Sequence, residues 1–277
     1  HLVASDSVFG FAFGSLASFA RTDARLLVRR PICLSAEHAT SLPITWSTVH
    51  VAFDHSKLHA RQIAMLHTAA GGVGLVSLEY ARLLGVAPHA TAGGMTKHSI
   101  IRQLDQPLVH SSRVGAAFAF GASQLTYGKR WHHVLNSLSA DLTSASFSML
   151  GEGSAFMEIG KRGVWSQERA ATACEAGIQL GVLAIDDELS SKPEWMQQQL
   201  TILAARSVKG MLHPLPLAVF DGWRSYEAAF RLLQSGSNVG KVALRIPRTQ
   251  SNWLAPQSTQ LITGGTGGLG LLTANWL

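Results

Sequence analysis

Apolar positions recur along the middle of the chain in two alternating patterns. Short apolar runs with the length of a buried strand predict strands at residues 63–67, 107–110, 131–135, 154–159 and 182–185. Segments with apolar residues at three- and four-residue steps predict helices at residues 75–84, 142–150 and 193–207. Strands that alternate with helices are typical of a doubly wound parallel α/β sheet, which is the fold class that this pattern predicts.

The segments on either side of this block are less regular. Residues 1–53 contain short apolar clusters and one amphipathic segment, which begins after Ser35 and is expected to end at Pro43 because proline breaks helices. Three further elements are expected after the sheet, namely a strand at 215–220, a helix at 226–234 and a strand at 241–246. Residues 248–260 are mostly polar, and this composition is typical of an interdomain linker.

A glycine-rich loop lies between the predicted strand 63–67 and the predicted helix 75–84. Its small residues Ala69, Gly71 and Gly74 fall at i, i+2 and i+5, a spacing that allows a sharp turn and a close approach to a pyrophosphate. The following helix N-terminus offers free N–H groups to the phosphates. We therefore predict a dinucleotide site at six consecutive residues, Ala69, Ala70, Gly71, Gly72, Val73 and Gly74. The alternative is a glycine-rich turn in another kind of α/β unit.

The charges after the loop indicate which dinucleotide it binds. An NAD site usually has Asp or Glu about 20 residues after the loop, where the carboxylate holds the ribose 2′-OH. No acidic residue occurs between Glu79 and Asp105, whereas Lys97, His98 and Arg102 lie there. Cations without a carboxylate suit a 2′-phosphate, so the prediction is NADPH; the alternative is that these are ordinary solvated helix residues. A proline at position 88 argues against a central strand in this region.

Composition limits the other possibilities. The chain has 277 residues, of which 47% are hydrophobic and 14% charged, which predicts a sizeable buried core. A net charge of +6 without a Lys/Arg run does not indicate nucleic-acid binding, and no apolar stretch is long enough to span a membrane. Two cysteines, Cys33 and Cys174, provide neither a disulfide framework nor a thiolate zinc site, so no metal is predicted. No signal peptide is visible at the start, and a cytoplasmic setting is expected.

A second glycine-rich signal follows near the C-terminus. Residues 260–262 lead as a short strand into Thr263-Gly264-Gly265-Thr266-Gly267-Gly268-Leu269-Gly270. A βαβ unit needs about 30 residues or more, and the chain stops at Leu277. The expectation is a second nucleotide-binding domain that begins here, in a fragment truncated at both ends.

Several segments together resemble a known family. They are LHTAAGGVGLVSLEYARLLGV at 66–86, HSSR at 110–113, VLNSLSAD at 134–141, EIGKRGVWS at 158–166 and AAFRLLQSGSNVGKVALRIP at 228–247. Residues 6–247 thereby resemble the enoyl reductase domain of type I polyketide and fatty acid synthases. The C-terminal segment resembles the start of a ketoreductase domain, which follows the enoyl reductase in such synthases.

This resemblance implies a fold and a division of the chain. The family is a medium-chain dehydrogenase/reductase without zinc, in which a Rossmann domain is inserted into a twisted-barrel substrate domain. The implied parts are a partial substrate domain at 1–53, the NADPH-binding domain at 54–212, a return to the substrate domain at 213–247, the linker at 248–260 and the ketoreductase start at 261–277.

The resemblance also implies a reaction, namely NADPH-dependent reduction of a trans-2-enoyl thioester carried by an acyl carrier protein. Neighbouring ketoreductase and dehydratase domains would be its partners. A stand-alone zinc-free quinone oxidoreductase shares the fold and the loop, although the second glycine signal argues against it. A catalytically silent scaffold segment of a synthase is the other alternative, and it is not expected to bind NADPH.

Individual residues match the motifs of the family. The match implies that Lys161 delivers the proton and that Asp186 is the partner of Lys161. Gly160, the residue before Lys161, is implied to lie at the cofactor. In addition to the six loop residues, eight residues match positions that bind the cofactor in the family: Thr48, Lys97, His98, Arg113, Asn136, Ser137, Leu138 and Gly160. The Lys97-His98 pair stands where the family has Lys-Arg. The family's T-A-Y-Y segment here reads Thr48-Val49-His50-Val51, so tyrosine is missing, and His50 is expected to be a packed side chain rather than a proton donor.

Overall fold

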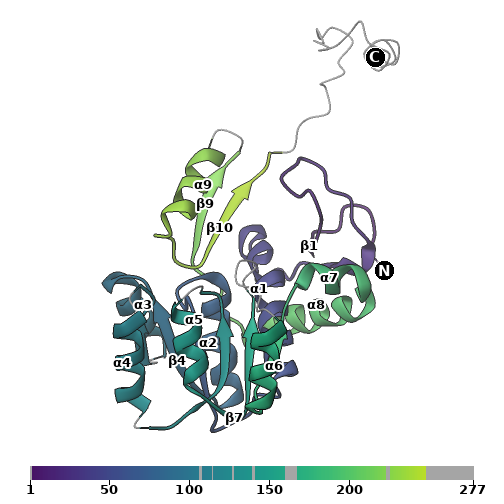
Figure 1. Ribbon diagram of the computed structural model, residues 1–277. Helices are drawn as coiled ribbons and strands as arrows, with labels where there is room; N and C mark the ends of the chain where they lie inside the picture. Colours follow the sequence, from purple (N-terminus) through teal and green to yellow (C-terminus); the bar gives the residue numbers. More distant parts are fainter. Residues whose placement is uncertain are drawn as a thin grey trace, which may run out of the picture.

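A six-stranded parallel sheet forms the centre of the computed structural model, which describes residues 2–247 apart from 106–107, 114, 127, 139–140, 160–166 and 223–224. The strands are β3 (Ile63–Leu66), β4 (Ala87–Ala92), β5 (Leu108–Ser111), β6 (Trp131–Asn136), β7 (Leu150–Glu158) and β8 (Gln179–Val182). Their spatial order is β5-β4-β3-β6-β7-β8, and every neighbouring pair is parallel (Figure 1). This confirms the predicted doubly wound sheet, whose order reverses between β3 and β6.

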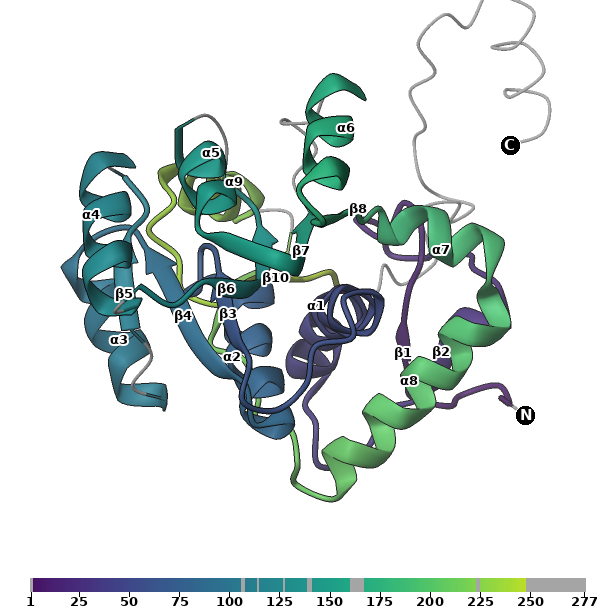
Figure 2. The same cartoon turned by 60° about the horizontal axis from the view of Figure 1, so that its bottom comes forward.

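Helices cover both faces of the sheet. They are α2 (Gly72–Leu84), α3 (Met95–Asp105), α4 (Gly115–Thr126), α5 (Asp141–Ser148) and α6 (Gln167–Glu175). Successive side chains of a strand point to opposite faces, so Leu66 and Leu135 pack in the core that includes α2, whereas Met65 and Val134 pack in the core that includes α4 and α5. Figure 2 shows α2 and α4 on opposite sides of the strands.

The first helix is longer than predicted. Helix α1 (Ala36–His55) is capped by Ser35, whose hydroxyl accepts from the N–H of His38 at 3.1 Å. The helix continues through Pro43. An interior proline costs about 3 kcal/mol. Burial of large apolar side chains after the proline, each worth roughly 1.5–3 kcal/mol, offsets this cost; these side chains are Trp46, Val49 and Phe53. The helix lies between the sheet and α8 (Pro193–Val208) (Figure 2).

Pro88 does lie in a central strand, contrary to the prediction. It is the second residue of β4, where it pairs with Ala64 of β3, and β5 begins its pairing only opposite His89. The proline therefore precedes the part of β4 that is hydrogen-bonded on both sides, and a missing N–H is tolerated at such a strand start.

Several predicted element boundaries were wrong, among them the start of β7, which lies at Leu150 and not at residue 154. The strand predicted at 182–185 is β8, which lies earlier in the chain and ends at Val182. Ile185 instead begins a short helix, α7 (Ile185–Ser191). Three carboxylates in the first turn of α7 favour this helix start because they face the positive end of its dipole. Helix α5 ends at Ser148, since Leu150 belongs to β7.

Two small sheets lie outside the central one. Strands β1 (Val8–Gly10) and β2 (Leu27–Arg29) pair antiparallel, with the short 3-10 helix η1 (Ala24–Leu26) before β2. Strands β9 (Leu217–Asp221) and β10 (Lys241–Arg245) pair parallel and are connected through α9 (Tyr226–Ser235). This βαβ unit stands above one edge of the central sheet (Figure 1).

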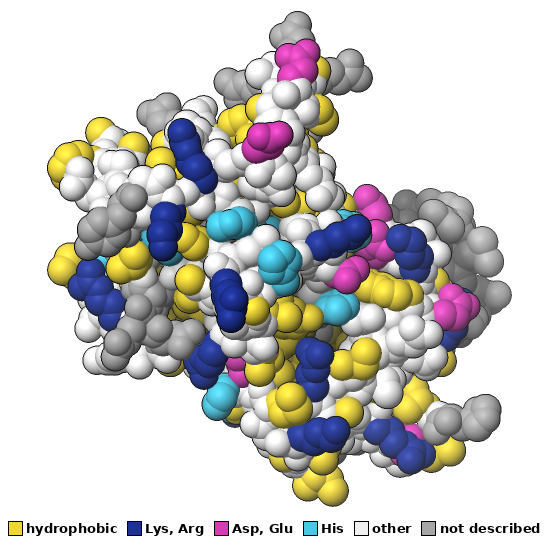
Figure 3. All heavy atoms as spheres, turned by 90° about the horizontal axis from the view of Figure 1, so that it is seen from below, with side chains coloured by type: hydrophobic (Ala, Val, Ile, Leu, Met, Phe, Trp, Pro, Cys, Tyr) yellow, Lys and Arg dark blue, Asp and Glu magenta, His cyan; other side chains and the backbone are white. Residues whose placement is uncertain are grey.

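The predicted linker 248–260 and the predicted ketoreductase start 261–277 lie outside the described residues. The division of residues 1–247 into domains stays a prediction. Within the described residues, no helix is both long and apolar enough to cross a membrane. On the face shown in Figure 3, Lys and Arg side chains are spread among apolar and His side chains and do not form one continuous stripe.

Candidate functional site

The glycine-rich loop joins β3 to α2 at the carboxyl edge of the sheet. Thr68 opens it with a φ of 49°, a left-handed conformation that is rare for a β-branched residue and that often marks a functional loop. The turn is closed by a 2.8 Å hydrogen bond from the N–H of Gly71 to the Thr68 carbonyl. Gly71 is the N-cap of α2 and has no side chain to accept from the first-turn N–H groups. The loop therefore leaves these donors for an anionic ligand.

Gly74 of the loop is required by the backbone around it, whereas Gly72 is bordered by side chains. A Cβ on Gly74 would lie 2.4 Å from the Ala69 Cα and 2.6 Å from the Thr68 carbonyl oxygen, both of which are backbone atoms. A Cβ on Gly72 would lie 2.4 Å from Lys241 Cδ and 3.1 Å from Thr45 Cγ2. Ala69 and Ala70 are buried, and Val73 is half-buried. The six predicted loop residues thus form one compact strand–turn–helix junction.

Lys241 is a site residue that the sequence analysis did not select. The first residue of β10, it lies beside Gly72 because the N–H of Gly240 donates to the Ala70 carbonyl at 2.8 Å. Burial lowers the pKa of Lys241, and within the described part of the chain it forms no ion pair. An ammonium at the start of α2 complements a bound anion. In the sequence, the one indication of a role for Lys241 was its position in segment 228–247, which resembles the enoyl reductase family.

A second cationic group lies at the ends of β4 and β5. A Cβ on Gly93 would lie 2.8 Å from Arg113 Nε, and Lys97 Nζ donates to the Gly236 carbonyl at 2.6 Å. Burial, and after it the positive charge of Arg113, lowers the pKa of Lys97. Two cations this close favour an anionic ligand between them. The structure therefore brings together Lys97, which was predicted at the 2′-phosphate, and Arg113, which was predicted on the adenosine side of the cofactor.

Two other predicted residues use their polar atoms within the protein. His98 Nε2 lies 2.9 Å from the Ala92 carbonyl, to which it donates, so this nitrogen faces the backbone of β4. The Thr48 hydroxyl donates to the Ile44 carbonyl of its own helix at 2.7 Å, and Thr48 is buried. The structure does not bring these polar atoms to the loop.

The predicted residues 136–138 follow β6, the strand next to β3. Asn136 is buried, whereas Ser137 and Leu138 are half-buried. The Ser137 hydroxyl lies 2.7 Å from the Thr68 hydroxyl, so the start of the glycine loop and the end of β6 are hydrogen-bonded to each other. In doubly wound sheets this point of order reversal is where ligands bind.

The predicted proton-delivery residues are only partly described. Lys161 and Gly160 lie outside the described residues. Asp186 is half-buried in the first turn of α7, and the neighbouring Asp187 is exposed. His50, at the position without tyrosine, has Nδ1 2.8 Å from the Tyr80 hydroxyl and stacks on Trp195 at a centroid distance of 6.4 Å. This agrees with the expected packed role of His50.

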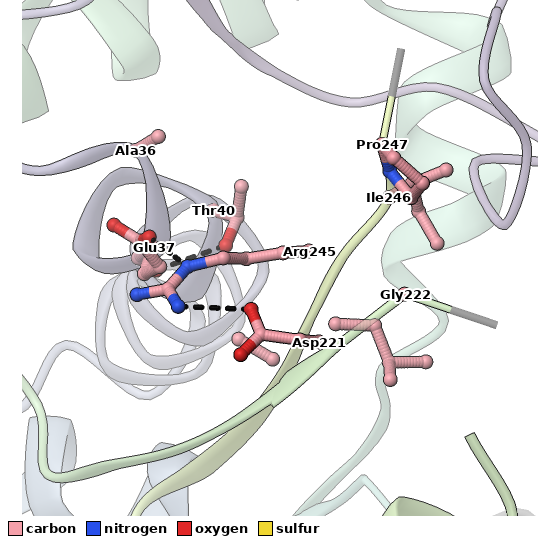
Figure 4. A pocket seen from close by; sticks show the side chains of 10 residues that line it. Ala36, Glu37, Thr40, Asp221, Gly222, Arg245, Ile246 and Pro247 are labelled. Carbon is pink, nitrogen blue, oxygen red and sulfur yellow. Dashed lines mark hydrogen bonds and ion pairs between the residues drawn. The ribbon is translucent and has the colours of Figure 1, made fainter. Parts of the chain in front are cut away.

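A large cleft lies elsewhere, between the N-terminal end of α1 and strands β9 and β10. Its volume is about 860 Å³, and no residue of the glycine loop lines it. Arg245 crosses it and binds Glu37 at 2.6 Å and Asp221 at 2.9 Å (Figure 4). Because two carboxylates neutralise this arginine, the cleft does not offer a free cation to a phosphate.

A parallel sheet in this order, with a glycine loop at its point of reversal and cations along the same edge, is typical of a dinucleotide-binding α/β fold. Residues 108–244 match the family described as zinc-binding dehydrogenase. The chain is 36% identical over 276 residues to erythronolide synthase EryA2 of Saccharopolyspora erythraea, covering 98% of this chain and 7% of that protein. It is similar to the CurK enoyl reductase, with a TM-score of 0.75, 29% identity, and coverage of 82% and 67% of the two chains.

A further solved structure is the nucleotide-binding subdomain of the enoylreductase domain of PpsC from Mycobacterium tuberculosis. It has a TM-score of 0.56 and 27% identity, covering 62% of this chain and 97% of that one. The chain belongs to the enoyl reductase domains of polyketide synthases, within the zinc-binding dehydrogenase family. It spans 7% to 13% of the length of the curated synthases that it matches.

The zinc in this family description finds no site in the part of the chain that the structure describes. No three His, Cys, Asp or Glu side chains there are grouped so that they could hold a metal ion, and both Cys33 and Cys174 are exposed. The described residues fit a dinucleotide instead, because a cradle that a Cβ would fill and a cation without an ion-pair partner meet at the start of α2.

Proposed function

We propose that this domain reduces trans-2-enoyl thioesters on an acyl carrier protein with NADPH as the cofactor. The observation that carries the proposal is the arrangement of Lys97, Arg113 and Lys241 around the carboxyl edge of the sheet. None of the three forms an ion pair with a carboxylate among the described residues. Their positions suit a ligand with separate phosphate groups, and membership of the enoyl reductase domains supports the reaction.

Each group then has a distinct part. The first-turn N–H groups of α2, together with Lys241, hold the pyrophosphate, and Lys97 and Arg113 hold the 2′-phosphate. Residues 136–138 would flank the nicotinamide, which when bound would supply hydride to the β-carbon of the thioester. Lys161 delivers the proton to the α-carbon, and Asp186 holds the ammonium of Lys161 in place. Binding that aligns nicotinamide and alkene lowers the entropic part of the barrier.

The first test is turnover of NADPH with crotonyl thioester, measured as loss of absorbance at 340 nm. The 277 residues are used together with any native flanking sequence. We expect turnover that Lys161→Ala lowers at least about tenfold, because a positioned acid contributes to the protonation step. Lys209→Ala, at the exposed end of α8, is the matched control and is expected to turn over like wild type.

Each result of this test is informative. Turnover that Lys161→Ala leaves unchanged would keep the reaction and remove Lys161 as the proton donor. Absence of both turnover and NADPH binding in the wild type would contradict the proposed function and leave the scaffold alternative.

The 2′-phosphate site has its own test. Arg113→Ala is expected to raise the Kd for NADPH about tenfold, which corresponds to about 1.4 kcal/mol, because a charge-assisted contact to the phosphate is lost. The Kd for NADH, which lacks that phosphate, is expected to stay the same. Lys129→Ala, an exposed cation just before β6, serves as control, and both constants come from fluorescence titration. Equal losses for the two cofactors would contradict the assignment.

A further inference from the structure

Two consecutive residues at the end of β3 are hydrogen-bonded to two consecutive residues at the end of β6. His67 Nδ1 lies 2.6 Å from Asn136 Oδ1, and the Thr68 and Ser137 hydroxyls lie 2.7 Å apart. Thr68 opens the glycine loop, and Ser137 belongs to the segment expected at the nicotinamide. The two pairs therefore join the two ends of the proposed cofactor site.

The amide of Asn136 has only one orientation that satisfies its neighbours. Its Nδ2 donates to the Leu138 carbonyl at 2.9 Å and to the carboxylate of Glu158, while Oδ1 accepts from the Leu138 N–H at 3.3 Å. Oδ1 must then accept from His67 as well, so the proton of His67 is on Nδ1.

The other ring nitrogen of His67 completes the arrangement. Burial lowers the pKa of His67 to about 4, so the ring is neutral near pH 7 and Nε2 is an acceptor. The Ser146 hydroxyl of α5 lies 2.9 Å from Nε2 and 2.7 Å from the Leu142 carbonyl, so these two acceptors share its single proton. His67 thus donates to Asn136, and Asn136 donates to Glu158.

Glu158 is the last residue of β7, and it is 2% exposed. A buried carboxylate is costly unless it accepts hydrogen bonds, and here it accepts from the amide that shapes residues 136–138. Three neighbouring strands, β3, β6 and β7, therefore contribute one side chain each to a single hydrogen-bonded network, with Ser146 as the fourth member.

We propose that Glu158 and His67 are positioning residues for hydride transfer, which they support by fixing Asn136 and the distance between the glycine loop and residues 136–138. This inference rests on the proposed function. Neither side chain needs to touch the cofactor. Hydride transfer depends steeply on the alignment of the reacting atoms, and a loop held by buried hydrogen bonds keeps that alignment.

Asn136 Nδ2 needs an acceptor at position 158, and this distinguishes two variants. Glu158→Leu removes the acceptor, and we expect kcat to fall about tenfold while the Kd for NADPH changes less than about threefold, since the phosphate contacts remain. Glu158→Gln keeps an acceptor oxygen and is expected to restore kcat to within about threefold of wild type. Glu152→Leu, an exposed carboxylate on the same strand, is the control.

Ser146→Ala adds no bulk and covers the case in which Glu158→Leu does not fold. It is expected to lower kcat about fivefold, as the loss of one buried hydrogen bond predicts, with an unchanged Kd for NADPH. The proposal is overturned if the variant that folds retains kcat within about twofold of the Glu152→Leu protein. It is also overturned if kcat and NADPH affinity fall together in every variant, because that pattern indicates a purely structural role.

The tautomer of His67 separates this inference from the proposed function. Nitrogen-15 NMR on the resting protein, without cofactor or substrate, is expected to show a neutral ring with the proton on Nδ1, and a mixture of tautomers in Glu158→Leu. A proton on Nε2 in wild type would overturn the network. Absence of wild-type turnover would overturn the proposed function, and the positioning role with it, even if the NMR result shows that the network exists.

Discussion

Replacement of Gly74 by alanine is expected to weaken NADPH binding at least about a hundredfold. The added Cβ would lie 2.4 Å from the Ala69 Cα and 2.6 Å from the Thr68 carbonyl oxygen, so backbone must move. Such a movement turns the first N–H groups of α2 away from the pyrophosphate, and each lost charge-assisted hydrogen bond costs about 1.5–3 kcal/mol. Fluorescence titration with NADPH measures the loss, and circular dichroism shows whether the helices remain.

Gly71→Ala is the matched control in the same loop. Gly71 has a φ of −81°, which alanine adopts readily, and an added Cβ would lie 3.3 Å from the nearest atom, the Thr68 carbonyl oxygen. We expect a Kd within about fivefold of wild type, equivalent to about 1 kcal/mol. Because alanine favours helices over glycine, a loss in Gly74→Ala cannot come from helix propensity. Equal affinity in the two variants would mean that the loop does not bind the pyrophosphate.

Acidification from pH 6.5 to pH 5 is expected to lower the free energy of unfolding by several kcal/mol. Burial lowers the pKa of four histidines far below the ordinary value of 6.5, to about 4 in three of them and about 3 in the fourth; they are His67, His89, His110 and His133. The unfolded chain binds protons at pH 6.5 and the folded protein does not. Stability is therefore complete above pH 6.5 and is lost as pH falls toward 4, by about 1.4 kcal/mol per pH unit for each histidine.

His133→Leu tests the largest of these contributions. His133 packs edge-on against Phe53, and neither of its ring nitrogens has a hydrogen-bond partner among the described residues. Leucine removes two buried unpaired polar atoms, so we expect higher stability at pH 7.5 and a pH slope reduced by about 1.4 kcal/mol per unit. Urea unfolding at pH 7.5, 6 and 5 measures both, and exposed His59→Leu is the control. An unchanged slope would show that His133 is not buried as a neutral ring.

Some features of this protein were readable from local sequence. The glycine loop depends on residues within one strand, one turn and one helix start, and spacing alone predicted it. The alternation of strand-like and helix-like segments likewise predicted the doubly wound sheet, because each element must bury one face. The cations proposed for the adenosine side were selected because no acidic residue lies between Glu79 and Asp105. The resemblance to the family added Arg113.

Two of the wrong predictions about helix and strand extent came from prolines. Propensity rules predicted that the first helix ends at Pro43 and that Pro88 does not lie in a central strand. The structure retains both elements, because burial of side chains after Pro43 outweighs one missing hydrogen bond and because Pro88 precedes the two-sided pairing of β4. These outcomes depend on packing and strand order, which propensity does not contain.

The sequence by itself determined the fold class and the glycine loop, and it predicted a phosphate-bearing dinucleotide. Only the tertiary structure placed Lys241 beside Gly72 and joined His67, Asn136, Ser146 and Glu158 into one network. The physical reason is the crossover connection of parallel strands. Each strand returns to the same edge of the sheet only after a helix, so residues that meet there are separated by many positions in the chain.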